Sequence, residues 1–114
     1  VNAKDEQGQS YLHLASWQGN LEMVQLLLAK GADPNKKNNT QQTALHLAAL
    51  GSHLQIVQEL LAQRATVNAR DESGKTPLFL SKNAAITQAL LAQGAHINAQ
   101  DASKNTPLHF LALN

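Results

Sequence analysis

The sequence predicts an all-α protein built from repeated pairs of short helices. The segment that begins at Ser10 recurs from Thr43 with an offset of 33 residues, and His13 and His46 keep this offset. A fixed period of roughly 20 to 50 residues is typical of proteins whose units stack in a row. Each copy also contains two stretches of apolar residues at helical spacing, separated by a turn. These observations together favour helix pairs over a mixed fold.

Each copy opens with a signal for the start of a helix. Thr76 and Thr106 are each followed by a proline. The hydroxyl suits an N-cap, and the proline suits the first helical position, where its missing N–H costs nothing. Thr43 and Ser10 can cap in the same way. We therefore expect a short first helix after each of these residues.

A second helix follows in each copy and carries one apolar stripe. Gly31 and Gly94 come just after two of these helices, where a left-handed residue ends a helix at little cost. Arg64 replaces the glycine in the second copy. Since a non-glycine residue in this conformation costs about 1 kcal/mol, we expect that end to be frayed or differently closed. The stripes are Leu21, Val24, Leu27 and Leu28, then Leu54, Val57, Leu60 and Leu61.

The third copy is three residues shorter than the others. The loss falls between Ser81 and Ala84, in the turn that joins its helices, and predicts a notch or a shortened first helix. Polar turns link successive copies. Gly74 occupies one of these turns, whereas Gln41 and Lys104 hold the equivalent places without the freedom of glycine.

The whole pattern resembles the ankyrin repeat, D-x-x-G-x-T-P-L-H-x-A followed by L-x-x-V-x-L-L-L-x-x-G-A-D-x-N. The resemblance implies L-shaped units, each a hairpin-like loop (the finger) followed by an antiparallel helix pair, stacked into a curved solenoid. It divides the single domain, residues 1–114, into the tail of an upstream repeat (1–4), three repeats (5–37, 38–70 and 71–100) and a partial repeat (101–114).

Composition excludes several classes of protein. The 114 residues carry a net charge of +1 and no cysteine, which argues against a strongly basic nucleic-acid binder, a disulfide scaffold and cysteine-based chemistry. No apolar run approaches the roughly 20 residues that span a bilayer, so we expect no membrane partner. The chain begins at Val1 without a methionine, and Phe110, Leu111 and Leu113 end it on a helix without a partner. We therefore expect a fragment that continues beyond Asn114 or packs on another chain.

The five histidines do not predict a metal site. His13, His46 and His109 share one place in the repeat, but units stacked about 10 Å apart cannot bring neighbouring imidazoles within the roughly 2 Å of zinc coordination. The resemblance implies that these imidazoles bridge backbone groups of neighbouring fingers. Phe79 holds that place in the third repeat, so the hydrogen bond must be missing there. His53 and His96 remain as isolated surface candidates.

Neither catalysis nor nucleic-acid binding finds support. No nucleophile elbow, phosphate loop or zinc-protease string occurs, and Asp71 and Glu72 look like solvated turn carboxylates. Lys37 and Arg70 end their repeats and could line one edge, but Asp71 and Glu72 follow Arg70 at once and largely cancel its field. We expect no catalytic residue, no cofactor and no nucleic-acid partner.

The resemblance implies three outward-facing places in each unit: the finger tip, the start of the first helix and the concave end of that helix. Trp17 lies off the buried stripe of its helix, and Leu50 holds the same place in the next copy, so we expect an apolar strip. Tryptophan is enriched among residues that dominate binding energies. The alternative is that Trp17 folds over the turn and covers Met23. The expected partner-binding residues are Trp17, Gln18, Leu50, Glu6, Gln7, Gln9, Asn39, Thr40, Gln42, Glu72, Ser73 and Lys75.

The first hypothesis is therefore a protein-interaction module that binds a protein through its finger tips and concave face. A second is a structural spacer within a longer array, with adjacent repeats or domains of the parent protein as neighbours. A third is a unit that recruits substrate for a catalytic domain elsewhere. We expect an intracellular location, in the cytoplasm or nucleus or after delivery into a host cell, since the chain lacks cysteine.

Overall fold

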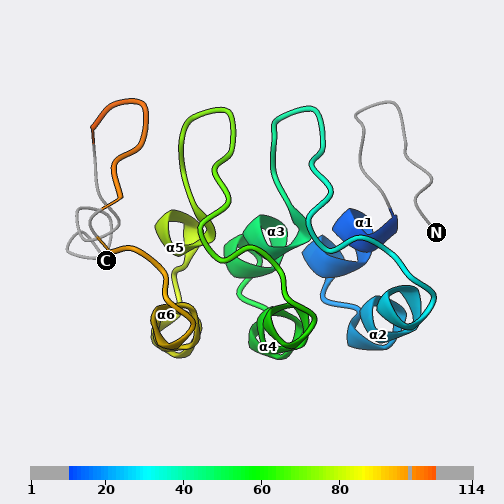
Figure 1. Cartoon of the computed structure of the whole chain (residues 1–114). Helices are drawn as coiled ribbons and strands as arrows, with labels where there is room; N and C mark the ends of the chain where they lie inside the picture. Colours follow the sequence, from blue (N-terminus) through cyan, green and yellow to red (C-terminus); the bar gives the residue numbers. More distant parts are fainter. Residues whose placement is uncertain (1–10, 98, 105–114) are drawn as a thin grey trace.

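The computed structural model describes residues 11–97 and 99–104, and this part of the chain contains six helices and no strand. The prediction of an all-α protein is therefore confirmed. The helices form three consecutive pairs (Figure 1). Their bounds are α1 Tyr11–Gln18, α2 Leu21–Ala29, α3 Ala44–Leu50, α4 Leu54–Ala62, α5 Pro77–Leu80 and α6 Ala84–Ala92.

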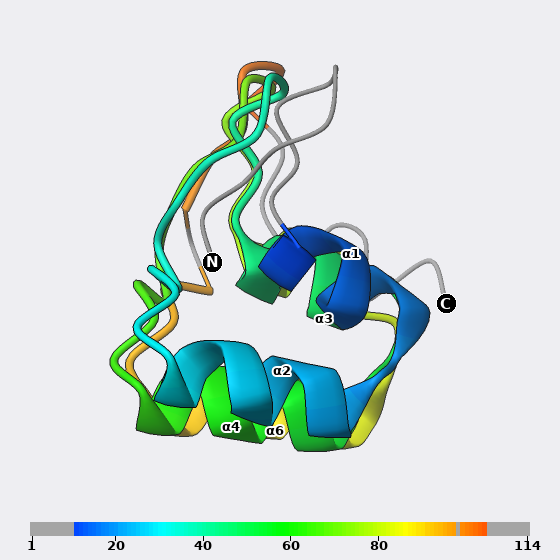
Figure 2. The ribbon, with the colours of Figure 1, turned by 90° about the vertical axis from the view of Figure 1, so that its right-hand side faces the viewer.

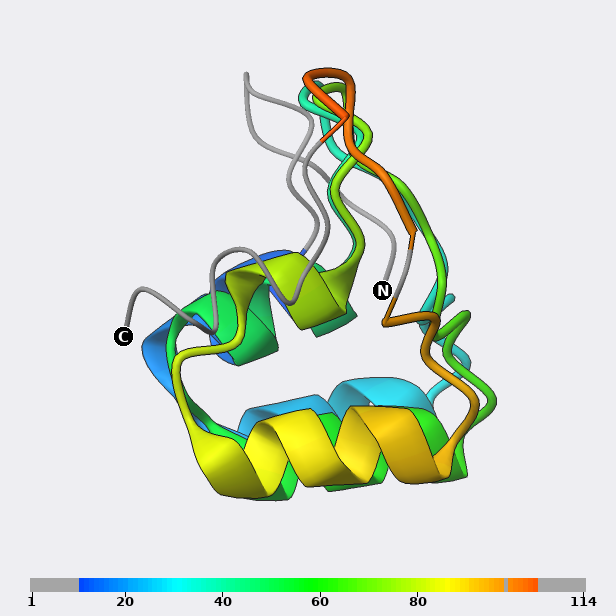
Figure 3. The same cartoon turned by 90° about the vertical axis from the view of Figure 1, so that its left-hand side faces the viewer.

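The three helix pairs stand side by side in a row. Helices α1, α3 and α5 contact one another in sequence along one layer, and α2, α4 and α6 do so along a second layer (Figure 1). The fingers project away from both layers, which gives each unit an L-shaped outline when the row is viewed from its ends (Figures 2 and 3). Because each unit touches only its neighbours, the row is held together by the interfaces between successive units.

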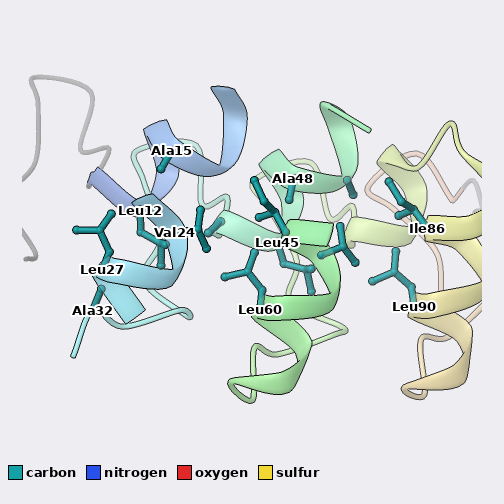
Figure 4. Close-up of a cluster of buried hydrophobic side chains, with 14 of the residues drawn as sticks. Leu12, Ala15, Val24, Leu27, Ala32, Leu45, Ala48, Leu60, Ile86 and Leu90 are labelled. Carbon is teal, nitrogen blue, oxygen red and sulfur yellow. The ribbon is translucent and has the colours of Figure 1, made fainter. Parts of the chain in front are cut away.

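One apolar core runs the length of the row between the two helix layers (Figure 4). Leu12, Leu45 and Leu78 come from the first helices, and Val57 and Leu90 come from the second helices. All are essentially inaccessible to solvent. Burial of a leucine-sized side chain contributes roughly 1.5 to 3 kcal/mol, so this continuous core supplies most of the stabilising free energy.

The threonines begin the first helices as expected, but they do so differently. The Thr43 hydroxyl oxygen accepts the His46 backbone N–H, and its O–H donates to His46 Nδ1. His46 Nδ1 also accepts the Thr43 backbone N–H, which completes a capping box. Thr76 is the N-cap of α5, with Pro77 in its first turn, yet the buried Thr76 hydroxyl makes no hydrogen bond. Phe79 stands where His46 stands in α3 and offers no nitrogen to bond.

The second helices all end in the same way. Gly31 and Gly94 have φ of +92°, as the sequence predicts. The expectation of a frayed or different end at Arg64 is wrong: Arg64 adopts φ of 67°, and the Ala65 N–H bonds the Leu60 carbonyl at 3.0 Å. The equivalent bond joins Ala32 and Leu27 in the first unit. The packing of the unit therefore outweighs the roughly 1 kcal/mol cost of a left-handed arginine.

Two turns that lack glycine keep the same left-handed backbone. Gln41 and Lys104 both have φ of 64°, close to the 77° of Gly74. In the turn between α3 and α4, the left-handed residue is Ser52 with φ of 62°, and the preceding Gly51 has an ordinary helical φ of −82°. The fold thus imposes the repeat's backbone on residues that do not favour it.

Buried histidines tie α1 and α3 to the fingers that follow them. His13 Nε2–H donates to the Gln42 carbonyl and His46 Nε2–H donates to the Lys75 carbonyl, both at 2.9 Å. This confirms that these imidazoles bridge to backbone groups of neighbouring fingers. Burial lowers the pKa of His46 below its usual value of 6.5, because the charged imidazolium would lose hydration there.

Further polar ties join the loops of successive units. Asn35 Oδ1 accepts the Thr66 N–H, and Asn68 Oδ1 accepts the His96 N–H at 2.9 Å. Lys37 donates to the Arg70 carbonyl at 3.0 Å, and Arg70 donates to the Gln100 carbonyl at 2.7 Å. The side chains thus recur with the repeat and fix the register between neighbouring fingers.

The shortening of the third unit acts on its first helix. Helix α5 has four residues, whereas α1 has eight and α3 has seven, which confirms the expected shortened helix. The buried Ser81 hydroxyl bonds the Asn83 carbonyl and the Thr87 hydroxyl, so the abbreviated turn is closed by side chains. None of the described helices combines the length and apolar character needed to cross a bilayer.

The two threonine caps provide a matched test of helix initiation. Thr43→Val removes the capping box, and we expect the free energy of unfolding to fall by about 1 to 2 kcal/mol. Thr76→Val removes a buried hydroxyl that makes no hydrogen bond, so stability should be unchanged or should rise. Urea denaturation of both variants checks this, and equal losses would contradict it.

The buried His46 should make stability depend on pH. Because its pKa is lower in the folded state than in the unfolded state, the unfolded state binds the proton more readily. The contribution is therefore complete above pH 6.5 and is lost as the pH falls below it. His46→Phe should be less stable than the wild type at about pH 7.5, with the difference narrowing towards about pH 5.5.

Urea denaturation of the wild type and of His46→Phe, at several pH values between about 5.5 and 7.5, measures the difference in their free energies of unfolding. The carboxylates are common to both proteins, so their titration cancels. A difference that stays constant or widens towards acid would show that His46 does not couple folding to protons.

Candidate protein-binding surface

The finger tips are joined into one edge by backbone hydrogen bonds. The Glu72 N–H donates to the Thr40 carbonyl at 3.0 Å, and the Ala102 N–H donates to the Ser73 carbonyl at 2.8 Å. Thr40, Glu72 and Ser73 therefore lie along a continuous rim. Of the predicted tip residues, Asn39, Thr40, Glu72 and Ser73 are exposed, and Gln42 and Lys75 are half-buried.

An acidic or amide side chain stiffens each finger from within. Asn38 Oδ1 accepts the backbone N–H groups of Thr40 and Gln42, and Asp71 Oδ1 accepts those of Ser73 and Lys75. Asp71 thus serves as a structural cap of the finger. The tips present their side chains from loops whose backbone is already hydrogen-bonded, so little conformational entropy remains to be lost on binding.

Trp17 and Leu50 occupy equivalent places near the ends of neighbouring helices. Trp17, in the last turn of α1, is 48% exposed, and Leu50, the last residue of α3, is half-buried. Because α1 and α3 pack against each other, these two apolar residues belong to adjoining helix ends. Among the three described helix pairs, the third has no helical residue at this place, since α5 stops at Leu80.

Some predicted residues belong elsewhere or lie outside the described part of the chain. Glu6, Gln7 and Gln9 are outside it, as are His109 and the apolar residues of the C-terminal segment. Gln18 is exposed and borders a pocket at the end of the row, next to Tyr11 and Asn20.

That pocket is part of an apolar end face that the sequence did not reveal. Tyr11 is 56% exposed, Met23 41% and Leu26 51%, and all three belong to α1 or α2. Tyr11 and Met23 line a pocket of about 350 Å³ together with Leu14 and Leu27. The signal was present, because Tyr11 and Met23 hold the places at which Ala44 and Ile56 are buried in the second unit.

One histidine was misjudged. The description of His53 as an isolated surface residue is wrong: His53 Nε2–H donates to the Trp17 carbonyl at 2.9 Å, and the ring is half-buried. His96 is exposed, as expected. A histidine at the start of a second helix gave no sequence signal for this bond, because the other units have Asn20 and Asn83 at that place.

Two basic side chains of the fingers are engaged in structure. Lys37 and Arg70, the candidates for a basic edge, donate to backbone carbonyls of the next unit. Within residues 11–97 and 99–104, no three His, Asp or Glu side chains gather as metal ligands would.

A family model described as ankyrin repeats (3 copies) matches residues 1–38 and 12–101. A comparison with curated proteins found no match.

Proposed function

The chain belongs to the ankyrin repeat family, and from this premise we propose that its finger tips and the concave ends of its first helices bind a protein partner. Repeats of this family generally act as protein-interaction modules. We assign the chain a role in binding and not in catalysis, in keeping with a family that is generally non-enzymatic.

The observation that carries the proposal is Trp17. It is the chain's single tryptophan, and about half of its surface is open to solvent in the last turn of α1, whereas Leu12 and Ala15 of the same helix are buried. A half-buried Trp is already held in place, so it can enter a partner's pocket at low entropic cost. Leu50 extends the apolar contact to the next helix, and the tip residues Asn39, Thr40, Glu72 and Ser73 supply polar contacts.

Affinity capture with a set of baits tests the proposal. Trp17→Ala should weaken capture of a specific partner by about 30-fold, because truncating an anchoring tryptophan costs about 2 kcal/mol. Its thermal stability should stay nearly intact, since the ring is half exposed. Leu91→Ala is a control, because it removes an exposed apolar side chain of α6, in the layer formed by the second helices. It should leave capture unchanged.

Quantitative mass spectrometry of captured proteins gives the readout, followed by affinity measurement on the partner identified. Unchanged capture by Trp17→Ala, with a large fall in its melting temperature, would refute the proposal and assign Trp17 to structure alone.

A second candidate function is that of a structural element in a longer row, and the end face of α1 and α2 favours it. Tyr11, Leu14 and Met23 correspond in register to Ala44, Leu47 and Ile56, which are buried. The face therefore has the form of a stacking surface that another helix pair could cover.

The same bait set separates the two candidates. Met23→Ser on the end face should abolish capture if a stacking helix pair is the partner, whereas Trp17→Ala should then have no effect. The opposite pattern is expected for binding through the tips and concave face, and it would exclude stacking as the mode of capture.

A further inference from the structure

The residue at the N-cap of the second helix makes a different side-chain hydrogen bond in the second unit than in the first and third. Asn20 accepts the Met23 N–H, and Asn83 accepts the N–H groups of Ala85 and Ile86, so each caps its own helix. His53 holds the same place before α4 and makes no side-chain bond to that helix. A missing N-cap bond costs about 1 kcal/mol, so the second unit forgoes a local stabilising contact here.

The His53 side chain instead reaches across to the neighbouring unit. Its Nε2–H donates to the Trp17 carbonyl at 2.9 Å, over a separation of 36 residues. Carbonyls in the last turn of a helix have no partner within the helix, and Trp17 lies in the last turn of α1. The imidazole thus caps the C-terminal end of α1 from outside.

The backbone of His53 is fixed by its own unit. Its N–H donates to the Ala48 carbonyl at 2.9 Å, and its carbonyl accepts the Val57 N–H at 3.0 Å. Ala48 belongs to α3 and Val57 to α4. The backbone of His53 therefore cannot move independently of α3 or α4.

Two glycines leave the space that the ring fills. A β-carbon at Gly19 would lie 2.5 Å from His53 Cε1, and one at Gly51 would lie 2.7 Å from Cδ2 and Nε2. Real β-carbons do not approach that closely. Gly19 follows α1 and Gly51 follows Leu50 directly, so the imidazole is wedged between the turns that follow the two apolar residues of the binding surface.

We propose that His53 is the positioning residue of the partner-binding surface, because its ring locks the end of α1, with Trp17, to the end of α3, with Leu50. The inference rests on the proposed function. Since the two helix ends are joined by one bonded ring, Trp17 and Leu50 are presented as a preorganised pair. A preorganised surface loses less entropy on binding than one that must be ordered by the partner.

Trp17 fluorescence tests the positioning without any partner, because the chain has no other tryptophan. His53→Ala should raise the acrylamide quenching constant of Trp17, by up to about twofold because 48% of the side chain is already exposed. It should also lower the fluorescence anisotropy at temperatures well below the melting transition. His96→Ala, which removes an exposed imidazole, should leave both quantities at wild-type values.

A second variant displaces the ring without deleting it. Gly51→Ala places a methyl group against the imidazole at a residue whose φ of −82° suits alanine. It should change Trp17 quenching in the same direction as His53→Ala, and it keeps the test informative if His53→Ala fails to fold. Wild-type quenching and anisotropy in both folded variants would overturn the proposal, because a purely stabilising histidine would lower the melting temperature alone.

Affinity for the partner captured by the wild-type protein completes the test. Weaker binding by His53→Ala, together with altered Trp17 fluorescence, supports the positioning role. Altered fluorescence with unchanged affinity would show that the position of Trp17 does not matter for binding, which overturns the inference. If Trp17→Ala itself binds normally, the proposed function fails, and this outcome is distinct from a failure of positioning alone.

Discussion

A pair of helices of four to nine residues cannot bury its apolar side chains by itself, and this constraint organises the whole molecule. Such a pair has core residues on both of its broad sides, so it needs a neighbour on each side. The second unit has both neighbours, and Leu45, Ile56 and Leu60 are buried there. The first unit has a described neighbour on one side only, and Tyr11 and Met23 remain exposed on the other. Whether an apolar side chain is buried in this fold therefore depends on the neighbouring units as well as on its own helix pair.

Polar side chains give the row its register, which apolar packing alone would not fix. The hydrophobic effect is non-directional, whereas the bond from His13 to the Gln42 carbonyl has a defined length and direction. His46 makes the equivalent bond in the next unit, and Asn35 and Asn68 make directional bonds between the loops that follow the second helices. These bonds fix the position of each finger relative to the unit before it.

Much of the fold could be predicted from the sequence, because the 33-residue spacing and the leucine stripes report directly on helices that bury one face. The shortened α5 could be predicted for the same reason, since the missing residues fall in a known turn. Arg64 was misjudged because backbone propensity is a local preference, and the packing of the whole unit overrides it. The end face could have been recognised by comparing Tyr11 and Met23 with Ala44 and Ile56 of the next copy, but His53 was missed because its bond joins two units. A contact of that kind leaves no trace in the spacing of one copy, and the tip and strip residues were assigned only through the resemblance.

The replacement of histidine by Phe79 makes the couplings along the row unequal. In a linear array, stability is a sum over neighbouring interfaces, so a weaker interface marks the place where segments separate first. A phenyl ring has no N–H to donate to the following finger, and the Thr76 hydroxyl beside it is left without a bond. Separation would therefore begin between the third unit and the finger that follows it. The first two units, which carry Trp17, Leu50 and His53, would still be stacked on each other at that stage, because the bonds from His13 and His46 remain.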